Sequence, residues 1–331
     1  MKPDQPVPLA WSPDHAVLEL MRARRDTGSR PGARTDGAKL GLSVEGGGMR
    51  GVVSGAMLVA IEDHGFADVF DAVYGGSSGS LNAAYFLTGN VWRWLSIYYE
   101  DLSTTRFLNI RAALLGLRPV LDIDWAFDTV VDGTKPLDYT AVLASATPLH
   151  VSITLVDEAR VIAPDRFASA AELRSALRAG AWLPVATRGT AEFRGERALD
   201  GGALVSHPSR LALQDGATHV LSVSSRACRP VSPGLLQRYA AWRLDRMRPG
   251  LGRRFREADA EGQSDRLRLV EWRTQPASPA VLDLGPRPDA EISRHEIDPT
   301  RLVAAARDAY QTMSTALTGV RGGASLRLTT D

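Results

Sequence analysis

Apolar residues along this chain follow two alternating patterns. Short, nearly continuous apolar runs, which are typical of buried strands, alternate with longer segments whose apolar or small residues recur at helical spacing. Residues 69–89 combine a strand, a sharp turn and a helix. Because strands alternate with helices, the pattern predicts an α/β domain with a mostly parallel sheet that helices cover on both faces. We expect further strands within 40–44, 150–163, 219–226 and 280–286, and helices over 15–25, 51–65, 169–182 and 299–317.

The chain divides into a short N-terminal part and one large domain. Residues 26–39 are rich in glycine, serine and arginine, which predicts a flexible linker. We therefore expect an N-terminal extension and linker over residues 1–39 and a single domain over residues 40–331. Within that domain, residues 235–275 are interpreted as an inserted flap.

This flap has an unusual composition. Residues 238–256 contain seven arginines, with Tyr239, Trp242 and Phe255 between them. One interpretation is a basic and aromatic surface that contacts anionic phospholipid headgroups. The other is a solvated helix whose aromatic side chains pack inward.

Composition and charge exclude several classes of protein and of binding site. The chain has 331 residues, of which 44% are hydrophobic and 23% charged, and its net charge of +1 gives no general attraction to nucleic acid or membranes. The single cysteine, Cys228, excludes an internal disulfide and a cysteine-based metal cluster. The N-terminus is polar and contains prolines, unlike a secretory signal, and no run approaches the ~18 apolar residues of a spanning helix. We expect a cytoplasmic protein without a metal or other cofactor.

The glycine-rich turn at residues 75–79 is the first candidate for chemistry. Its sequence, Gly-Gly-Ser-Ser-Gly, places Ser77 in a G-x-S-x-G pattern between a strand and a helix. A nucleophile on such a tight turn has a strained backbone and needs small neighbours, which Gly75 and Gly79 provide. Taken alone, the pattern also fits a glycine-rich loop with incidental serines.

A second glycine-rich loop comes earlier in the chain. Gly46, Gly47 and Gly48 follow the first predicted strand, and their bare N–H groups are suited to an oxyanion. The segment up to Ser77 leaves room for one helix and one strand, so both loops should lie at the same end of neighbouring parallel strands. The loop also reads as G-x-G-x-x-G, a dinucleotide-binding pattern, but its acidic partner Asp71 comes too early in its strand to reach a ribose.

A serine nucleophile also needs a base. Asp200 follows a predicted strand and precedes two glycines, which would let its carboxylate approach a serine, although in isolation it fits an ordinary turn aspartate better. A triad of Ser77, Asp200 and His295 is a second interpretation, although the nucleophile comes too early for an α/β-hydrolase. His207 precedes Pro208 and is better explained as a helix-start residue.

Three stretches in order, "GGGMRG", "GGSSGSLNAA" and "LDGGAL", resemble the patatin-like phospholipase family over residues 40–205. The resemblance implies a three-layer α/β/α fold and a catalytic dyad in which Ser77 is the nucleophile and Asp200 the general base. It also implies an oxyanion hole, in which Arg50 would hold the loop in place. The residues of that oxyanion hole are Gly46, Gly47, Gly48, Met49 and Arg50.

Two features depart from the family pattern. Glu45 stands where many relatives carry Asp, Ser or Gly before the glycines. In the segment 178–186, Gly180 replaces the usual serine and Trp182 enlarges the next position. Neither change removes a catalytic atom, but both would alter the pocket and with it the substrate preference.

The resemblance implies a lipid acyl hydrolase of the phospholipase A or lysophospholipase type, a serine esterase that needs no cofactor. Its substrate would be a lipid ester, with peripheral contact to an anionic membrane surface and no role for nucleic acid. The alternatives are the α/β-hydrolase-type esterase with the triad described above and a non-catalytic lipid-binding protein.

Overall fold

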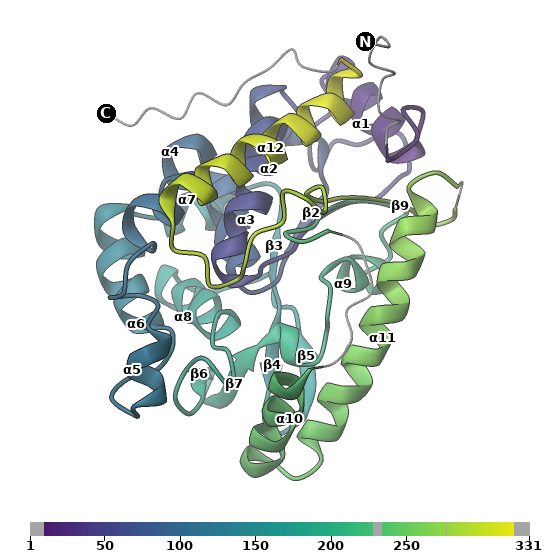
Figure 1. Cartoon of the computed structure of the whole chain (residues 1–331). Coiled ribbons are helices and arrows are strands. Elements are labelled where there is room, and N and C mark those ends of the chain that lie inside the picture. The colour runs from purple at the N-terminus through teal and green to yellow at the C-terminus, as the bar shows by residue number, and fades with distance from the viewer. Residues whose placement is uncertain (1–9, 228–233, 276, 321–331) are drawn as a thin grey trace, which may run out of the picture.

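Two β-sheets organise the fold (Figure 1). The computed structural model describes residues 10–227, 234–275 and 277–320. The first sheet has five parallel strands in the order β3-β2-β1-β8-β9, and the second has four antiparallel strands in the order β5-β4-β7-β6. The strands of the first sheet are β1 (Leu40–Val44), β2 (Ala72–Gly75), β3 (Leu149–Val151), β8 (His219–Val223) and β9 (Ala280–Leu284). Those of the second are β4 (Ile153–Leu155), β5 (Arg160–Ile162), β6 (Ala191–Phe193) and β7 (Glu196–Asp200).

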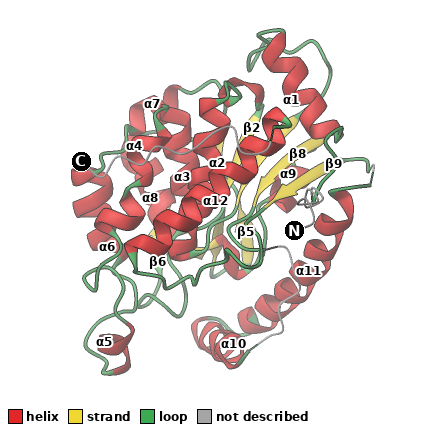
Figure 2. Ribbon diagram, turned by 45° about the horizontal axis from the view of Figure 1, so that its top comes forward, coloured by secondary structure: helices red, strands yellow, loops and turns green. Residues whose placement is uncertain are grey.

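Helices cover the parallel sheet and extend beyond it (Figure 2). The α-helices are α1 (Ala16–Asp26), α2 (Gly51–Asp63), α3 (Ser78–Thr88), α4 (Val91–Leu95), α5 (Ile110–Leu114), α6 (Ile123–Trp125), α7 (Tyr139–Ala144), α8 (Ala170–Gly180), α9 (Ser209–Gln214), α10 (Leu235–Met247), α11 (Leu251–Trp272) and α12 (Pro299–Thr318). Short 3₁₀ or π segments are η1 (Gly48–Arg50), η2 (Ala67–Val69), η3 (Ile97–Asp101), η4 (Ala126–Thr134) and η5 (Gly201–Ala203).

Alternate residues of the parallel strands face two separate cores. Leu42 of β1 and Val73 of β2 belong to the larger core, which also contains α2 and α12. Tyr74 and Val220 point the other way, into a smaller core that includes Leu269 of α11. Because successive side chains of a strand point to opposite faces of the sheet, the helices on the two faces bury both sets of side chains. The chain therefore has the three-layer α/β/α fold that the sequence predicts.

The N-terminal part is anchored to this domain. Residues 27–39, which follow α1, contain no helix or strand. Arg34 nevertheless pairs with Asp71 at 2.8 Å, and Arg24 of α1, which is almost completely buried, pairs with Asp36 and Asp71 at 2.7 Å each. These ion pairs hold the segment against the start of β2, a connection that composition alone does not indicate.

The antiparallel sheet was not predicted as a separate unit. Only Ser152 separates β3 from β4, so the chain passes directly from the first sheet into the second. The Ser152 N–H donates to the carbonyl of Gly75 at the end of β2 (3.1 Å), and Ile153 pairs with Asp200 at the end of β7. This crossing brings the carboxyl end of β7 to the carboxyl end of β2.

Residues 235–275 contain a helical hairpin formed by α10 and α11, and α11 runs beside β9 at the edge of the parallel sheet (Figure 2). Phe255 is partly buried against the core. Tyr239 and Trp242 are about half exposed, so the interpretation in which the aromatic side chains pack inward holds only for Phe255.

Candidate active site

Ser77 lies on a tight turn between β2 and α3. Its backbone angles are φ 55° and ψ −134°, a region that residues with a side chain rarely adopt. Gly75 and Gly79 cannot be replaced without steric clashes. A Cβ on Gly75 would lie 2.4 Å from Ser80 Cα, and one on Gly79 would lie 2.3 Å from the carbonyl of Val44. The turn therefore has the geometry of a nucleophile elbow, with its glycines in the positions that the pattern predicts.

The first glycine loop lies directly against this turn. A Cβ on Gly46 would lie 2.3 Å from the carbonyl oxygen of Gly76 and 2.6 Å from Ser77 Cβ, so only glycine fits there. Gly48 has φ 62°, which also favours glycine. The two loops thus lie side by side at the carboxyl ends of β1 and β2.

Ser78 joins the two loops through its side chain. Its Oγ accepts a hydrogen bond from Gly47 N–H (3.1 Å) and donates one to the carbonyl of Gly48 (3.2 Å). The Met49 N–H donates to the carbonyl of Arg294 (3.2 Å). Among the described residues, the N–H groups of Gly46 and Gly48 have no acceptor.

Asp200 ends β7 beside this turn and is buried. Its Oδ1 accepts a hydrogen bond from Gly202 N–H (2.7 Å), while its Oδ2 is buried and has no hydrogen-bond partner among the described residues. Burial raises the pKa of Asp200 to about 6, and the nearby Ser77 hydroxyl and the Gly202 N–H act in the opposite direction. A buried, incompletely bonded carboxylate next to a strained serine is the arrangement expected of a reactive pair.

Steric contacts explain why a glycine follows Asp200 in the D-G-G sequence. A Cβ on Gly201 would lie 1.6 Å from Ser152 Oγ, so the turn after Asp200 packs against the junction of β3 and β4 without room for a side chain. The Asp200 N–H donates to the carbonyl of Trp182 (3.0 Å). Trp182, one of the two departures in segment 178–186, therefore lies in the loop that borders Asp200, and its own side chain is almost fully buried.

A buried polar network supports the elbow from behind. The amide Nδ2 of Asn82 in α3 donates to the carbonyl of Gly51 (2.7 Å) and to Ser54 Oγ (3.2 Å), and its Oδ1 accepts from the hydroxyl of Tyr98 (2.9 Å). Burial raises the pKa of Tyr98, so its hydroxyl stays neutral and can donate. These hydrogen bonds give a structural reason for the asparagine in the "GSLNAA" stretch. No sequence pattern indicates Tyr98.

Glu45 anchors the glycine loop rather than lining a pocket. It is buried, and its carboxylate pairs with Arg266 of α11 (2.5 Å) and Arg226 (3.4 Å) and accepts from Ser225 N–H (2.8 Å). Although burial opposes ionisation, these arginines hold the pKa of Glu45 well below its usual range. The Ser225 Oγ in turn donates to the carbonyl of Gly46, which ties the loop to the end of β8.

Arg50 also lies behind the loop. Its guanidinium is mostly buried and lies 3.7 Å from a carboxylate oxygen of Glu291. The Arg50 N–H donates to the carbonyl of Gly47 (3.4 Å), so this N–H turns back into the loop.

The histidines do not join Ser77 and Asp200. Among the described residues, the ring of His295 makes no hydrogen bond or ion pair with Asp200. Both ring nitrogens of His207 are occupied, Nδ1 by Ser209 Oγ (2.8 Å) and Nε2 by Ser224 Oγ (3.1 Å). His207 thus serves a buried hydrogen-bond network.

The geometry also disfavours a dinucleotide site. Asp71 precedes β2, at the opposite end of the strand from the glycine loop, and its carboxylate is bound by Arg24 and Arg34. It is therefore unavailable to a ribose at the glycine loop.

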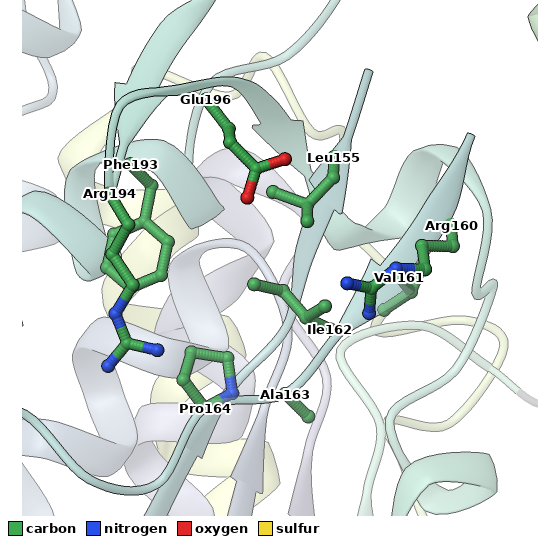
Figure 3. A pocket seen from close by; sticks show the side chains of 9 residues that line it. All are labelled: Leu155, Arg160, Val161, Ile162, Ala163, Pro164, Phe193, Arg194 and Glu196. Carbon is green, nitrogen blue, oxygen red and sulfur yellow. The ribbon is translucent and has the colours of Figure 1, made fainter. Parts of the chain in front are cut away.

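A separate cavity of about 420 Å³ lies on the antiparallel sheet (Figure 3). It contains neither Ser77 nor Asp200, and its two arginines pair with Glu158 and Glu172, outside the lining. It offers no unpaired buried polar group for chemistry. Its lining residues are Leu155, Arg160, Val161, Ile162, Ala163, Pro164, Phe193, Arg194 and Glu196.

The described residues contain neither a candidate metal-binding group nor a helix that could cross a membrane. None of their His, Cys, Asp and Glu side chains gather in groups of three or more that could hold a metal ion. None of the helices in residues 10–227, 234–275 and 277–320 combines the length and the apolar character needed to cross a membrane.

The sequence matches the model of a known protein family. No curated protein matches the sequence significantly. Residues 42–213, just over half of the chain, match the family described as "Patatin-like phospholipase". This segment contains both glycine loops, Ser77 and Asp200, and the parallel sheet has the architecture that the resemblance implied. The chain therefore belongs to the patatin-like phospholipase family.

Proposed function

We propose that the protein is a serine esterase of the phospholipase A or lysophospholipase type that hydrolyses a lipid ester with Ser77 and Asp200. The observation that carries the proposal is the buried carboxylate of Asp200, whose Oδ2 lacks a partner, beside a serine held at φ 55°. Membership of the family supports lipid acyl hydrolysis in general. The cytoplasmic location expected from the sequence remains part of the proposal.

In the first half-reaction, Ser77 Oγ attacks the acyl carbonyl and its proton passes to Asp200. A pKa of about 6 leaves this carboxylate mostly ionised at neutral pH, yet makes it a stronger base than an ordinary aspartate. The protonated Asp200 then gives its proton to the leaving alcohol oxygen as the carbon–oxygen ester bond breaks. The products are the free alcohol and an acyl-enzyme on Ser77.

In the second half-reaction, Asp200 takes a proton from water, whose oxygen attacks the acyl carbon. Ser77 leaves with the proton, and the fatty acid is released. In both steps the carbonyl oxygen becomes negative, and the proposed donors are the N–H groups of Gly46 and Gly48, which have no acceptor among the described residues. One such donor lowers the barrier by ~3–4 kcal/mol.

The other residues assigned to the oxyanion loop have supporting roles in this scheme. Gly47 N–H is bonded to Ser78, and Met49 N–H to Arg294. Arg50 holds the loop through its ion pair with Glu291, and Glu45, which directly precedes the loop, holds it through Arg266.

Hydrolysis of p-nitrophenyl esters of increasing chain length, followed by a panel of phospholipids, tests the proposal. Wild type should release p-nitrophenol, and Ser77→Ala should reduce the rate to the background. Equal rates for wild type and Ser77→Ala would contradict the assignment of the nucleophile. Absence of turnover by wild type on every ester would favour the non-catalytic lipid-binding alternative.

A further inference from the structure

Two exposed apolar patches lie at the same end of the molecule. Helices α5 and α10 both occupy the end away from α1 in both orientations (Figures 1 and 2). In the α5 patch, Leu114, Leu115 and Leu117 are between 72% and 82% exposed. Folded proteins rarely present several adjacent leucines to water without a use for them.

The α10 patch has an ordered aromatic pair. Leu235, Tyr239 and Trp242 recur at helical spacing and lie on the exposed face of α10, whereas Ala241 and Leu244 face inward and are buried. The rings of Tyr239 and Trp242 stack with centroids 5.7 Å apart. The inner face of α10 thus already supplies its packing against the domain, and the outer face is left unpartnered among the described residues.

Positive charge is concentrated beside the α10 patch. Residues 235–256 contain seven arginines and one acidic residue, Asp245, which accepts a hydrogen bond from Gly252 N–H within the hairpin. Near the α5 patch the charge is weaker, because Arg106 and Arg118 pair with Asp122 at 2.6 Å and 3.5 Å, whereas Arg111 has no acidic partner among the described residues. This concentration of charge occurs in a chain whose net charge is only +1.

The α5 patch is attached to the loop that borders Asp200. The carbonyl of Gly116, between the exposed leucines, accepts a hydrogen bond from Arg188 (2.6 Å). The Leu121 N–H donates to the carbonyl of Ala186 (2.9 Å), and the same loop begins at Trp182, whose carbonyl receives the Asp200 N–H. A bilayer or other surface that binds the α5 patch would therefore lie close to the loop that borders Asp200.

We propose that the α5 and α10 patches together form a docking surface for a bilayer that contains anionic phospholipid. Leucine side chains enter the acyl region, Trp242 and Tyr239 lie at the level of the headgroups, and the arginines bind lipid phosphates. A second copy of this chain is a poorer occupant, because it would bring two arginine-rich surfaces together. The inference rests on the proposed function for its substrate, but docking itself requires no turnover.

Co-sedimentation with vesicles tests the inference, using vesicles of equal parts phosphatidylglycerol and phosphatidylcholine. Two variants are compared with wild type: Leu114→Ser combined with Leu115→Ser, and Trp242→Ala. Their matched controls are Leu143→Ser on α7 and Trp92→Ala on α4, which lie away from this end (Figures 1 and 2). Trp92 is 49% exposed and Trp242 is 53% exposed, so the two tryptophan substitutions remove comparable surface.

We expect the vesicle partition coefficient to fall by about tenfold or more in each test variant, since burial of one large apolar side chain is worth at least that factor. The controls should bind like wild type, and vesicles of phosphatidylcholine alone should bind more weakly. Hydrolysis of a soluble short-chain p-nitrophenyl ester should be unchanged in Trp242→Ala. Failure of the proposed function would remove that hydrolysis from wild type but leave the sedimentation result intact.

Three outcomes would overturn the docking surface. One is equal vesicle binding by wild type and both test variants. Another is an equal loss of binding in the controls. The third is a wild-type dimer in light scattering that Trp242→Ala dissociates, which would make the face an interface between copies.

Discussion

Asp200→Asn should make the protein more stable while it removes activity. Burial raises the pKa of this carboxyl from 3.8 to about 6, so keeping it ionised in the folded state costs about 3 kcal/mol at neutral pH. Asparagine has nearly the same shape, and its Oδ1 can still accept the Gly202 N–H. We expect the free energy of unfolding at pH 7 to rise by about 2–3 kcal/mol.

Because the pKa of Asp200 is raised in the folded state, the stability gained by Asp200→Asn depends on pH. Below pH 3.8 the wild-type carboxyl is protonated in both the folded and the unfolded state, so the difference from asparagine is small. Between that value and pH 6 the unfolded state ionises first, and wild type loses stability relative to the variant. Above pH 6 both states are ionised and the difference is constant.

Urea unfolding of wild type and Asp200→Asn between pH 5 and pH 8 measures this difference. Asp128→Asn is a control, because its ion pair with Arg174 is exposed and should contribute less than about 1 kcal/mol. A less stable Asp200→Asn, or a gain that does not change between pH 5 and pH 7, would refute the idea that Asp200 is a destabilised, buried carboxylate.

Four further predictions concern the same site. For a soluble ester, kcat/KM should rise with an apparent pKa of about 6 as Asp200 loses its proton, and a flat profile from pH 5 to pH 8 would contradict its role as the base. Esterase assays of His295→Ala should give nearly wild-type rates, whereas a triad requires a loss of about 10⁶-fold. Chemical denaturation should show Ser77→Gly to be more stable than Ser77→Ala by about 1–2 kcal/mol, because glycine relieves the strain at φ 55°; equal stabilities would mean that the turn is not strained. Gly46→Ala should fold but lose activity by about 10²-fold or more, because its Cβ would lie 2.3 Å from the carbonyl of Gly76 and displace the loop. Full activity of this variant would mean that the loop has no role in catalysis.

The sequence predicted those parts of the site that depend on local sterics. Glycines beside a strained serine leave a short pattern, and the predicted strand and helix on each side place the two loops together. For this reason the strained turn at Ser77, the close approach of Gly46 and the three-layer fold could be inferred without coordinates, whereas the catalytic roles of Ser77 and Gly46 stay predictions.

Other parts depend on contacts that no local pattern encodes. Strands are predicted within 150–163 and before Asp200, but the sequence does not show that β4 pairs with β7, so the separate antiparallel sheet that carries Asp200 is not predicted. Glu45 is a departure from the family pattern, and only the structure pairs it with Arg266, which is 221 positions away. The exposure of Leu114 and Trp242 was equally hidden, since hydropathy does not distinguish a buried face from an uncovered one.

The most direct test of the central claim is to label the protein with a fluorophosphonate and to locate the modified residue by mass spectrometry. The account predicts a single modified serine, Ser77, in wild type, much slower labelling of Asp200→Asn and none at this position in Ser77→Ala. Labelling at another serine that persists in Ser77→Ala, or equal labelling rates for wild type and Asp200→Asn, would contradict the claim that Ser77 and Asp200 form one reactive pair.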